Sequence, residues 1–244
     1  MDTAQIAALL QPFLEQPLTL SQLDQISTYI DLLRRWNARI NLTAIRKDEE
    51  IVTRHFGESF FLARHLFPTR TAGAPPKLCL GGDVRNSSGN WQPATGNWVL
   101  GTGYCPLRVL DIGSGAGFPA LPLKLWAPHI HLTLIESNHK KAAFLREVAR
   151  ALTLTDINVI AARAETLSAD PAFPKANFVT LRAVERFHKI LPHAASFLAP
   201  NGTLALLISS AYLPHLSTQT TIKWTLPIPI PQSHSRVLLV GCRP

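Results

Sequence analysis

The residues best suited to chemistry lie in one glycine-rich segment, where positions 109–119 read Val-Leu-Asp-Ile-Gly-Ser-Gly-Ala-Gly-Phe-Pro. An apolar stretch over 107–112 predicts a strand, and Gly113, Gly115 and Gly117 follow it at alternate positions. Because glycine has no Cβ, such a loop turns tightly and lets a ligand approach the main chain. A loop of this kind between a parallel strand and a helix is the usual place for a nucleotide-like cofactor.

The same segment favours one class of cofactor over another. A dinucleotide fingerprint, Gly-x-Gly-x-x-Gly, would need its third glycine at position 118, which is Phe118 here. Asp111 would also lie poorly beside a pyrophosphate, whereas it can face the ammonium group of an adenosine with an amino-acid tail, directly or through water. The loop therefore indicates S-adenosylmethionine and argues against a nicotinamide oxidoreductase. A glycine-rich turn without a ligand is the alternative for the loop alone.

A second acidic residue supports the cofactor interpretation. Residues 130–136 have the alternation of a strand and end in Glu136, which follows Asp111 by 25 residues. In a βαβ unit, a carboxylate at this place accepts protons from both ribose hydroxyls. A solvated strand end is the alternative for Glu136 taken alone, but its spacing from the loop favours a cofactor contact.

The elements that must position these residues follow from the apolar periodicity. Strands are expected near 107–112, 130–136, 157–161, 176–182, 202–208, 221–229 and 235–241, and helices near 117–126, 138–151 and 187–198. Five parallel strands closed by a hairpin predict an α/β, Rossmann-like class I methyltransferase domain over 107–244, with a seven-stranded, mostly parallel sheet. An N-terminal helical region over 1–67 extends it.

In the N-terminal region, apolar residues at helical spacing predict one helix over 21–37, with Ser21 as its N-cap, and another over about 50–67. The helical period turns Arg54 and Glu58 of the second helix toward solvent.

Residues 68–106 are rich in Gly, Pro and Asn and are expected to form a loop or a weak hairpin. The aromatic residues Trp91, Trp98 and Tyr104 within it are of a type that stacks on nucleic-acid bases. The simpler interpretation is that they anchor the insertion on the protein.

Composition excludes several classes of protein. With 244 residues and 46% hydrophobic content, the chain can build one domain with a substantial core. Neither a transmembrane stretch nor a secretory signal is evident. The three cysteines lack a Cys-x-x-Cys pair and the nine histidines lack a His-Glu-x-x-His pattern, so we expect no metal site and no disulfide framework. A cytoplasmic monomer is the default expectation.

Charge points to a polyanionic partner. The formal net charge is +8, and residues 175–244 hold seven Lys and Arg against one acidic residue, Glu185. Such an excess favours association with a nucleic acid, although it says nothing of the fold.

Seven segments, taken in order, carry a family resemblance. They are Leu33-Arg34-Arg35-Trp36-Asn37, Asn41-Leu42-Thr43, Arg54-His55-Phe56-Gly57-Glu58-Ser59, Asp111 to Pro119, Leu134-Ile135-Glu136-Ser137, Arg163-Ala164-Glu165 and Leu181-Arg182-Ala183. Together they resemble the ribosomal small-subunit methyltransferase G family, also called glucose-inhibited division protein B. The glycine loop is common to many methyltransferases, whereas the ordered set is specific.

The resemblance implies methyl transfer from S-adenosylmethionine to N7 of a guanine in 16S ribosomal RNA, at family position 527 in the decoding region. It also implies cofactor contacts at Gly113, Phe118, Ala164, Glu165 and Arg182. Combined with the loop, the cofactor-binding set is Asp111, Gly113, Ser114, Gly115, Gly117, Phe118, Glu136, Ala164, Glu165 and Arg182. For Arg182, a plain ion pair with Glu185 or Glu165 is the alternative.

This chemistry asks for no general base, because guanine N7 already carries a free lone pair. Alignment of N7 with the methyl group and exclusion of water would suffice. The product ring is cationic, and a carboxylate such as Glu58 or Glu165 would stabilise it. Phosphate contacts are expected from Arg34, Arg35, Arg39, Arg54, His55, Arg186, Lys189 and Arg236; for Arg34 and Arg35 the simpler interpretation is a solvated helix face, and for His55 a packing role.

The chain departs from the family pattern in three places. Ala120 replaces a glycine, Ile208-Ser209-Ser210 replaces a Lys-Gly pair, and the 68–106 insertion replaces a short connection and is expected to form an accessory surface or to be disordered. The lost lysine keeps open a cofactor-binding RNA-associated module with weak catalysis. A class I methyltransferase acting on another substrate is the other alternative, although it would not need the basic carboxyl-terminal half.

Overall fold

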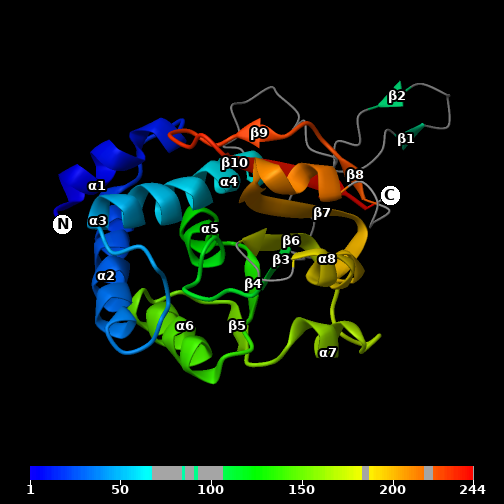
Figure 1. Cartoon of the computed structure of the whole chain (residues 1–244), viewed down its shortest axis with the longest axis horizontal. Helices are drawn as coiled ribbons and strands as arrows, with labels where there is room; N and C mark the ends of the chain where they lie inside the picture. The colour runs from blue at the N-terminus through cyan, green and yellow to red at the C-terminus, as the bar shows by residue number, and fades with distance from the viewer. Residues whose placement is uncertain (68–83, 86–90, 93–106, 183–186, 217–221, 244) are drawn as a thin grey trace.

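The computed structural model describes residues 1–67, 84–85, 91–92, 107–182, 187–216 and 222–243 (Figure 1). Its main sheet has the strand order β5-β4-β3-β6-β7-β10-β8, with β9 paired to β10. The strands are β3 (Arg108–Ile112), β4 (His131–Ile135), β5 (Ile157–Ile160), β6 (Ala176–Arg182), β7 (Leu198–Ser209), β8 (Lys223–Trp224), β9 (Ile228–Pro229) and β10 (Arg236–Cys242). The first five in sheet order are parallel and β10 is antiparallel to β7. This is the expected class I methyltransferase sheet, with eight strands rather than seven.

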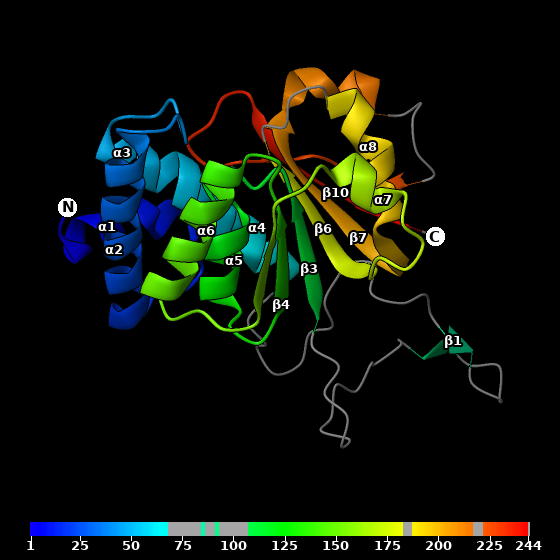
Figure 2. The same cartoon turned by 90° about the horizontal axis from the view of Figure 1, so that it is seen from below.

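Helices cover the sheet on both faces (Figure 2). The helical elements are α1 (Thr3–Leu10), η1 (Gln11–Phe13), α2 (Leu20–Asn37), α3 (Asp48–Glu50), η2 (Ile51–Gly57), α4 (Glu58–Leu66), α5 (Ala120–Trp126), α6 (His139–Ala151), α7 (Ala164–Ser168), α8 (Phe187–Ser196) and η3 (Ser210–His215). The N-terminal helices share one apolar core with α5 and α6, and α8 shares a second core on the opposite face. Alternate residues of β3 divide between the cores, since Val109 joins the first and Leu110 the second.

The long N-terminal helix, α2, begins two residues earlier than expected. Its N-cap is Thr19, whose side chain accepts from the Gln22 backbone N–H while the Gln22 side chain accepts from the Thr19 N–H. The expectation that Ser21 is the N-cap was wrong, because this reciprocal capping box satisfies two helix-end donors at once. The apolar stripe is confirmed, with Leu23 and Ile26 among its buried members.

The expected helix over 50–67 is interrupted by a π-helical segment, η2. In a π-helix each N–H bonds five residues back rather than four, so the following side chains change face relative to an α-helix. Arg54 is exposed as expected, but Glu58 is only 2% exposed. The expectation that Glu58 faces solvent was therefore wrong.

Other local differences are small. The expected strand over 221–229 consists of the short strands β8 and β9, and the helices α1 and α7 were not anticipated. Within the insertion, β1 (Val84–Arg85) pairs antiparallel with β2 (Trp91–Gln92). The proposed roles of Trp98 and Tyr104 fall outside the described residues. No helix in the described ranges is long and apolar enough to span a bilayer.

Candidate active site

The glycine loop links the carboxyl end of β3 to α5. Gly113, Gly115 and Gly117 all have positive φ angles of 70°, 54° and 87°. These values lie in the left-handed region that glycine adopts without steric cost. The backbone N–H groups of Gly113 and Ser114 both donate to the Ile135 carbonyl at the end of β4, at 2.9 and 3.1 Å. The loop is therefore tied to the neighbouring strand at the carboxyl edge of the sheet.

Glu136 lies beside this loop and is nearly buried. One carboxylate oxygen accepts from the Gly115 N–H and the other from the Asn138 N–H, each at 2.8 Å. A carboxylate has about four lone-pair sites, so each oxygen can still accept one more hydrogen bond. This orientation suits the two hydroxyls of a ribose.

Asp111 is the second carboxylate of the loop, and only one of its oxygens has a hydrogen-bond partner. Thr180, its parallel neighbour on β6, donates its hydroxyl to Oδ1 at 2.6 Å. Oδ2 is buried without a partner, and burial raises the pKa of Asp111 to about 6. A buried, unpartnered carboxylate oxygen beside an open glycine loop fits a ligand that carries an ammonium group or a water that bridges to one.

The N-terminal region holds the loop from the other side. The Tyr29 hydroxyl, on α2, donates to the Ala116 carbonyl. The Tyr29 and Phe118 rings are stacked with centroids 5.2 Å apart, and the His55 ring stacks on Phe118 at 4.6 Å. A Cβ at Gly117 would collide with the Tyr29 hydroxyl. The helical extension is thus part of the cofactor loop's support.

Arg182, at the end of β6, is held by three acceptors from the π-helical segment and the residue after it. Its Nη1 donates to His55 Nδ1 at 2.9 Å, and its Nη2 donates to the Arg54 carbonyl at 2.6 Å and lies 3.2 Å from a Glu58 carboxylate oxygen. Burial lowers the pKa of Arg182 to about 10, so it stays charged near neutral pH. Its Nε is buried without a hydrogen-bond partner. Of the two acids named as alternative partners of Arg182, Glu185 lies outside the described residues, and the pair with Glu165 is replaced by one with Glu58.

His55 is neutral in this arrangement. Because Nδ1 accepts from Arg182, the proton lies on Nε2, which donates to the Thr43 hydroxyl at 2.8 Å. Burial, together with the positive charge of Arg182, lowers the pKa of His55 to about 2. His55 therefore positions Arg182 and has no exposed charge to offer a phosphate.

Glu58 also binds a second arginine, since Arg236 Nε at the start of β10 lies 2.8 Å from its other oxygen. Arg236 Nη2 donates to the Leu207 carbonyl at 3.2 Å. We call Arg54, His55, Glu58, Arg182 and Arg236 the arginine cluster. It joins the helical region to two strands and carries an excess of positive charge. Because two arginines compensate Glu58, Glu165 is the better candidate for stabilising a cationic base.

The remaining RNA-binding candidates lie on the surface. Arg34 is 3.3 Å from Asp48 in an exposed ion pair, and Arg35 and Arg39 are exposed at the end of α2. Lys189 is exposed on the first turn of α8. Arg186 lies outside the described residues. The structure thus separates an exposed basic group at the end of α2 from the arginine cluster, whose central members Glu58 and Arg182 have buried side chains.

Ala164 and Glu165 form the start of α7, after β5 and therefore also at the carboxyl edge of the sheet. Ala164 is buried in the second core, and Glu165 is exposed. Their cofactor contacts stay predictions carried by the family resemblance.

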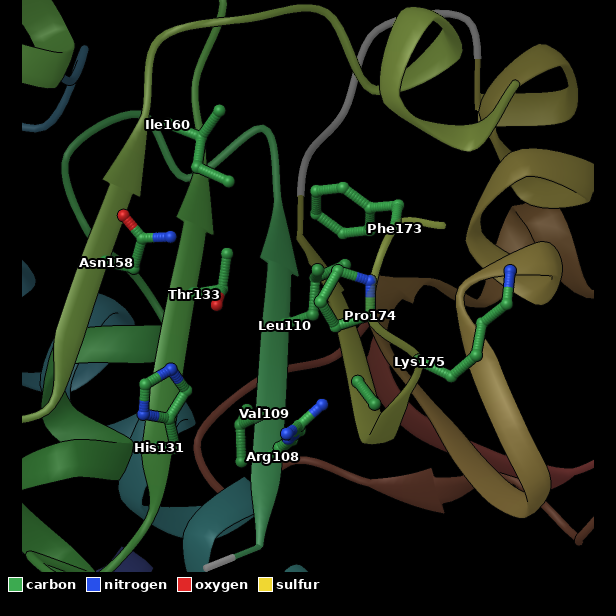
Figure 3. A pocket seen from close by; sticks show the side chains of 11 residues that line it. Arg108, Val109, Leu110, His131, Thr133, Asn158, Ile160, Phe173, Pro174 and Lys175 are labelled. Carbon is green, nitrogen blue, oxygen red and sulfur yellow. The ribbon is translucent and has the colours of Figure 1, made fainter. Parts of the chain in front are cut away.

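A cavity of about 170 Å³ lies elsewhere, on the β3–β4–β5 face opposite α5 and α6 (Figure 3). Arg108 and His131 mark its end near the amino ends of these strands, and Lys175 lies at its side. No carboxylate lines it, so it lacks groups for a ribose or an ammonium ion. The candidate cofactor site is therefore at the glycine loop, with its two carboxylates, and not in this cavity.

Two residues of the site were not anticipated. Tyr29 lies within the helix expected over 21–37, and no sequence pattern assigned it a separate role. Its contact with Ala116 joins residues that are 87 positions apart, which local patterns do not indicate. Thr180 is a polar residue inside the apolar strand β6, and that interruption is the signal that identifies it.

Comparisons with known proteins agree with this geometry. The model of a family described as rRNA small subunit methyltransferase G matches residues 22–72 and 102–225. Residues 73–101, which it leaves unmatched, fall inside the insertion. The chain is 37% identical over 190 residues to a ribosomal RNA small subunit methyltransferase G of Roseiflexus castenholzii, covering 75% of this chain and 66% of that protein. It is 35% identical to the protein of that name from Streptococcus agalactiae, covering 84% and 73%.

For the Roseiflexus and Chloroflexus relatives the chain spans 55% to 66% of their length. Among solved structures, a ribosomal protein L11 methylase of Lactobacillus delbrueckii subsp. bulgaricus is similar, with a TM-score of 0.48 and 18% identity over 57% of this chain and 71% of that chain. The sheet order is that of class I methyltransferases, whose methyl donor is S-adenosylmethionine. By its sequence, the chain belongs to the rRNA small subunit methyltransferase G family.

Proposed function

We propose that this protein transfers a methyl group from S-adenosylmethionine to N7 of a guanine in 16S ribosomal RNA, at the position that the family resemblance implies. The observation that carries the cofactor assignment is the unpartnered Oδ2 of Asp111 beside the glycine loop. The names of the relatives support a small-subunit ribosomal RNA as the substrate. We further infer that the protein acts as a monomer in the cytoplasm.

Each residue of the proposed site contacts a different part of the cofactor. Glu136 accepts the ribose hydroxyls, and Asp111 faces the ammonium group of the amino-acid tail. The glycine loop provides a backbone surface without Cβ atoms for the rest of the cofactor. Arg182, with an Nε that has no protein partner, offers a donor for a carboxylate or a phosphate near the end of β6.

The reaction needs little from side chains. When bound, the cofactor supplies a methyl group on a sulfonium sulfur; the N7 lone pair forms the new N–C bond, and the electron pair of the broken S–C bond stays on sulfur. Positive charge moves from sulfur to the guanine ring and no proton is lost. The protein therefore acts by aligning the two partners and excluding water, which agrees with a described site whose buried histidine is neutral.

The test is methyl transfer from labelled S-adenosylmethionine to small ribosomal subunits that lack the modification, with the labelled base mapped. We expect label at N7 of a single guanine in 16S ribosomal RNA. Asp111→Ala should abolish transfer and S-adenosylhomocysteine binding together, whereas Asp24→Asn, at an exposed acid on α2, should change neither. Tight S-adenosylhomocysteine binding without transfer to subunits would contradict the proposed substrate.

A further inference from the structure

An exposed aromatic ring lies at the carboxyl edge of the sheet. Tyr212, in η3 directly after β7, is 50% exposed, and the other exposed large apolar side chains of the described ranges, Leu20 and Leu226, are aliphatic. Phe187 begins α8 after β6, and its ring centroid is 6.0 Å from that of Tyr212. Phe187 is half-buried, so it supports Tyr212 from the protein side and leaves part of the Tyr212 ring open to solvent.

This pair lies at the edge of the sheet where a methyl acceptor is expected to bind. The glycine loop and Glu136 follow β3 and β4, so they place the cofactor over that half of the edge. β6 is the other neighbour of β3, and β7 lies next to β6. Phe187 begins α8, which follows β6, and Tyr212 lies in η3, which follows β7. Figure 2 shows α8 beginning at this edge of the sheet. Ligands of open α/β sheets bind outside these carboxyl ends.

We propose that the Phe187–Tyr212 pair receives the target guanine, with the base stacked on the open face of the Tyr212 ring. This assignment rests on the proposed function. Flipped or unpaired bases bind proteins by stacking on aromatic side chains, because each base has a flat π face. Exposed Lys189, two residues beyond Phe187 on the same helix, suits the adjoining phosphate.

The pair also contributes to the rate. As the N–C bond forms, the guanine ring becomes positively charged, and an aromatic face attracts a cation through its quadrupole. The attraction is weaker for the neutral guanine than for the transition state. An interaction that strengthens in this way accelerates the reaction rather than only tightening substrate binding. Tyr212 thereby provides electrostatic stabilisation that Glu58, paired with two arginines, does not.

The first test needs no turnover. Affinities of the full chain for 7-methylguanosine monophosphate and for guanosine monophosphate are measured by calorimetry with saturating S-adenosylhomocysteine. We expect the methylated nucleotide to bind about fivefold more tightly. Tyr212→Leu should abolish the preference, and Tyr212→Phe should retain it. The proposal would be overturned if the chain without substitutions bound the two nucleotides equally tightly. It would also be overturned if the preference for the methylated nucleotide persisted in Tyr212→Leu.

A second test measures single-turnover methylation of unmodified small subunits. Tyr212→Leu should lower the rate about tenfold at saturating subunits, with unchanged affinity for S-adenosylhomocysteine and with recovery in Tyr212→Phe. Leu226→Ala, which removes an exposed apolar side chain elsewhere, is the control. An unchanged rate in Tyr212→Leu contradicts the proposal. If the unmodified chain methylates no subunits, the proposed substrate fails, and the nucleotide preference still decides the role of the pair.

Discussion

The glycine loop and the arginine cluster each bury one carboxylate, and they satisfy it in opposite ways. Asp111 keeps one oxygen without a partner and has a raised pKa. Glu58 has an arginine within ion-pair distance of each oxygen. We propose that the first carboxylate serves a ligand at the expense of the ligand-free fold. The second pairs with arginines on two strands of the sheet and so joins the helical region to the sheet. Burial of an acid therefore does not by itself identify a binding residue; the partners of its oxygens do.

The largest effect that separates the two regions is expected for Glu58→Gln. Removing this charge leaves the buried Arg182, and Arg236 with its 18% exposed side chain, without their counter-charge. Loss of one partner of a buried ion pair costs about 3 to 5 kcal/mol of unfolding free energy. Urea denaturation monitored by circular dichroism measures it. Asp48→Asn breaks the exposed pair with Arg34, whose side chain is 56% exposed, and should change stability by less than about 1 kcal/mol. Similar losses in both variants would contradict the structural role of Glu58.

Sequence patterns predicted the glycine loop better than the arginine cluster, for a physical reason. The loop depends on residues close in sequence: Asp111 precedes its glycines, and Glu136 ends the next strand. Local turn chemistry and strand periodicity therefore locate both. The parallel strands of the sheet were predicted on the same basis, because βαβ units repeat along the chain.

The arginine cluster depends on contacts between distant residues and on an irregular helix. A regular 3.6-residue period places Glu58 on the exposed face with Arg54, and the π-helical segment that changes this phase has no simple sequence signal. One clue was present, since Glu58 is the only acid within the apolar run from Phe56 to Leu62. An acid in such a run needs a buried partner, but the sequence does not indicate that the partner is Arg236, 178 positions later.

Asp111→Asn should have opposite effects on folding and on binding. In the ligand-free fold the pKa of Asp111 is raised from 3.8 to about 6. Above pH 6 the carboxylate is ionised in the folded and in the unfolded chain, and its charge destabilises the fold. Below about pH 4 the carboxyl group is protonated in both the folded and the unfolded chain, so it no longer affects stability. Two pKa units correspond to at most about 3 kcal/mol. The variant should therefore unfold at a higher temperature than the unmodified chain at pH 7, with no difference near pH 4.

The effect of Asp111→Asn on ligand binding is measured as the affinity for S-adenosylhomocysteine. Affinity of the unmodified chain should fall as the pH drops below about 6, because protonation of Asp111 removes the charge that faces the ammonium group. Asp111→Asn should bind weakly at every pH and lose this dependence. A variant that is both less stable and unchanged in affinity at pH 7 would place Asp111 with Glu58 as a structural acid.

The smallest effect is expected where the helical region supports the loop. Tyr29→Phe keeps the stacked ring on Phe118 and removes only the hydrogen bond to the Ala116 carbonyl, which should cost about 1 kcal/mol of unfolding free energy. If the extension orders the loop for its ligand, S-adenosylhomocysteine affinity should fall several-fold as well. Thr28→Ala, which removes a neighbouring hydroxyl bonded within α2 to the Asp24 carbonyl, is the matched control. A loss of stability with unchanged affinity in Tyr29→Phe would limit Tyr29 to packing, because the loop would then reach its binding conformation without this hydrogen bond.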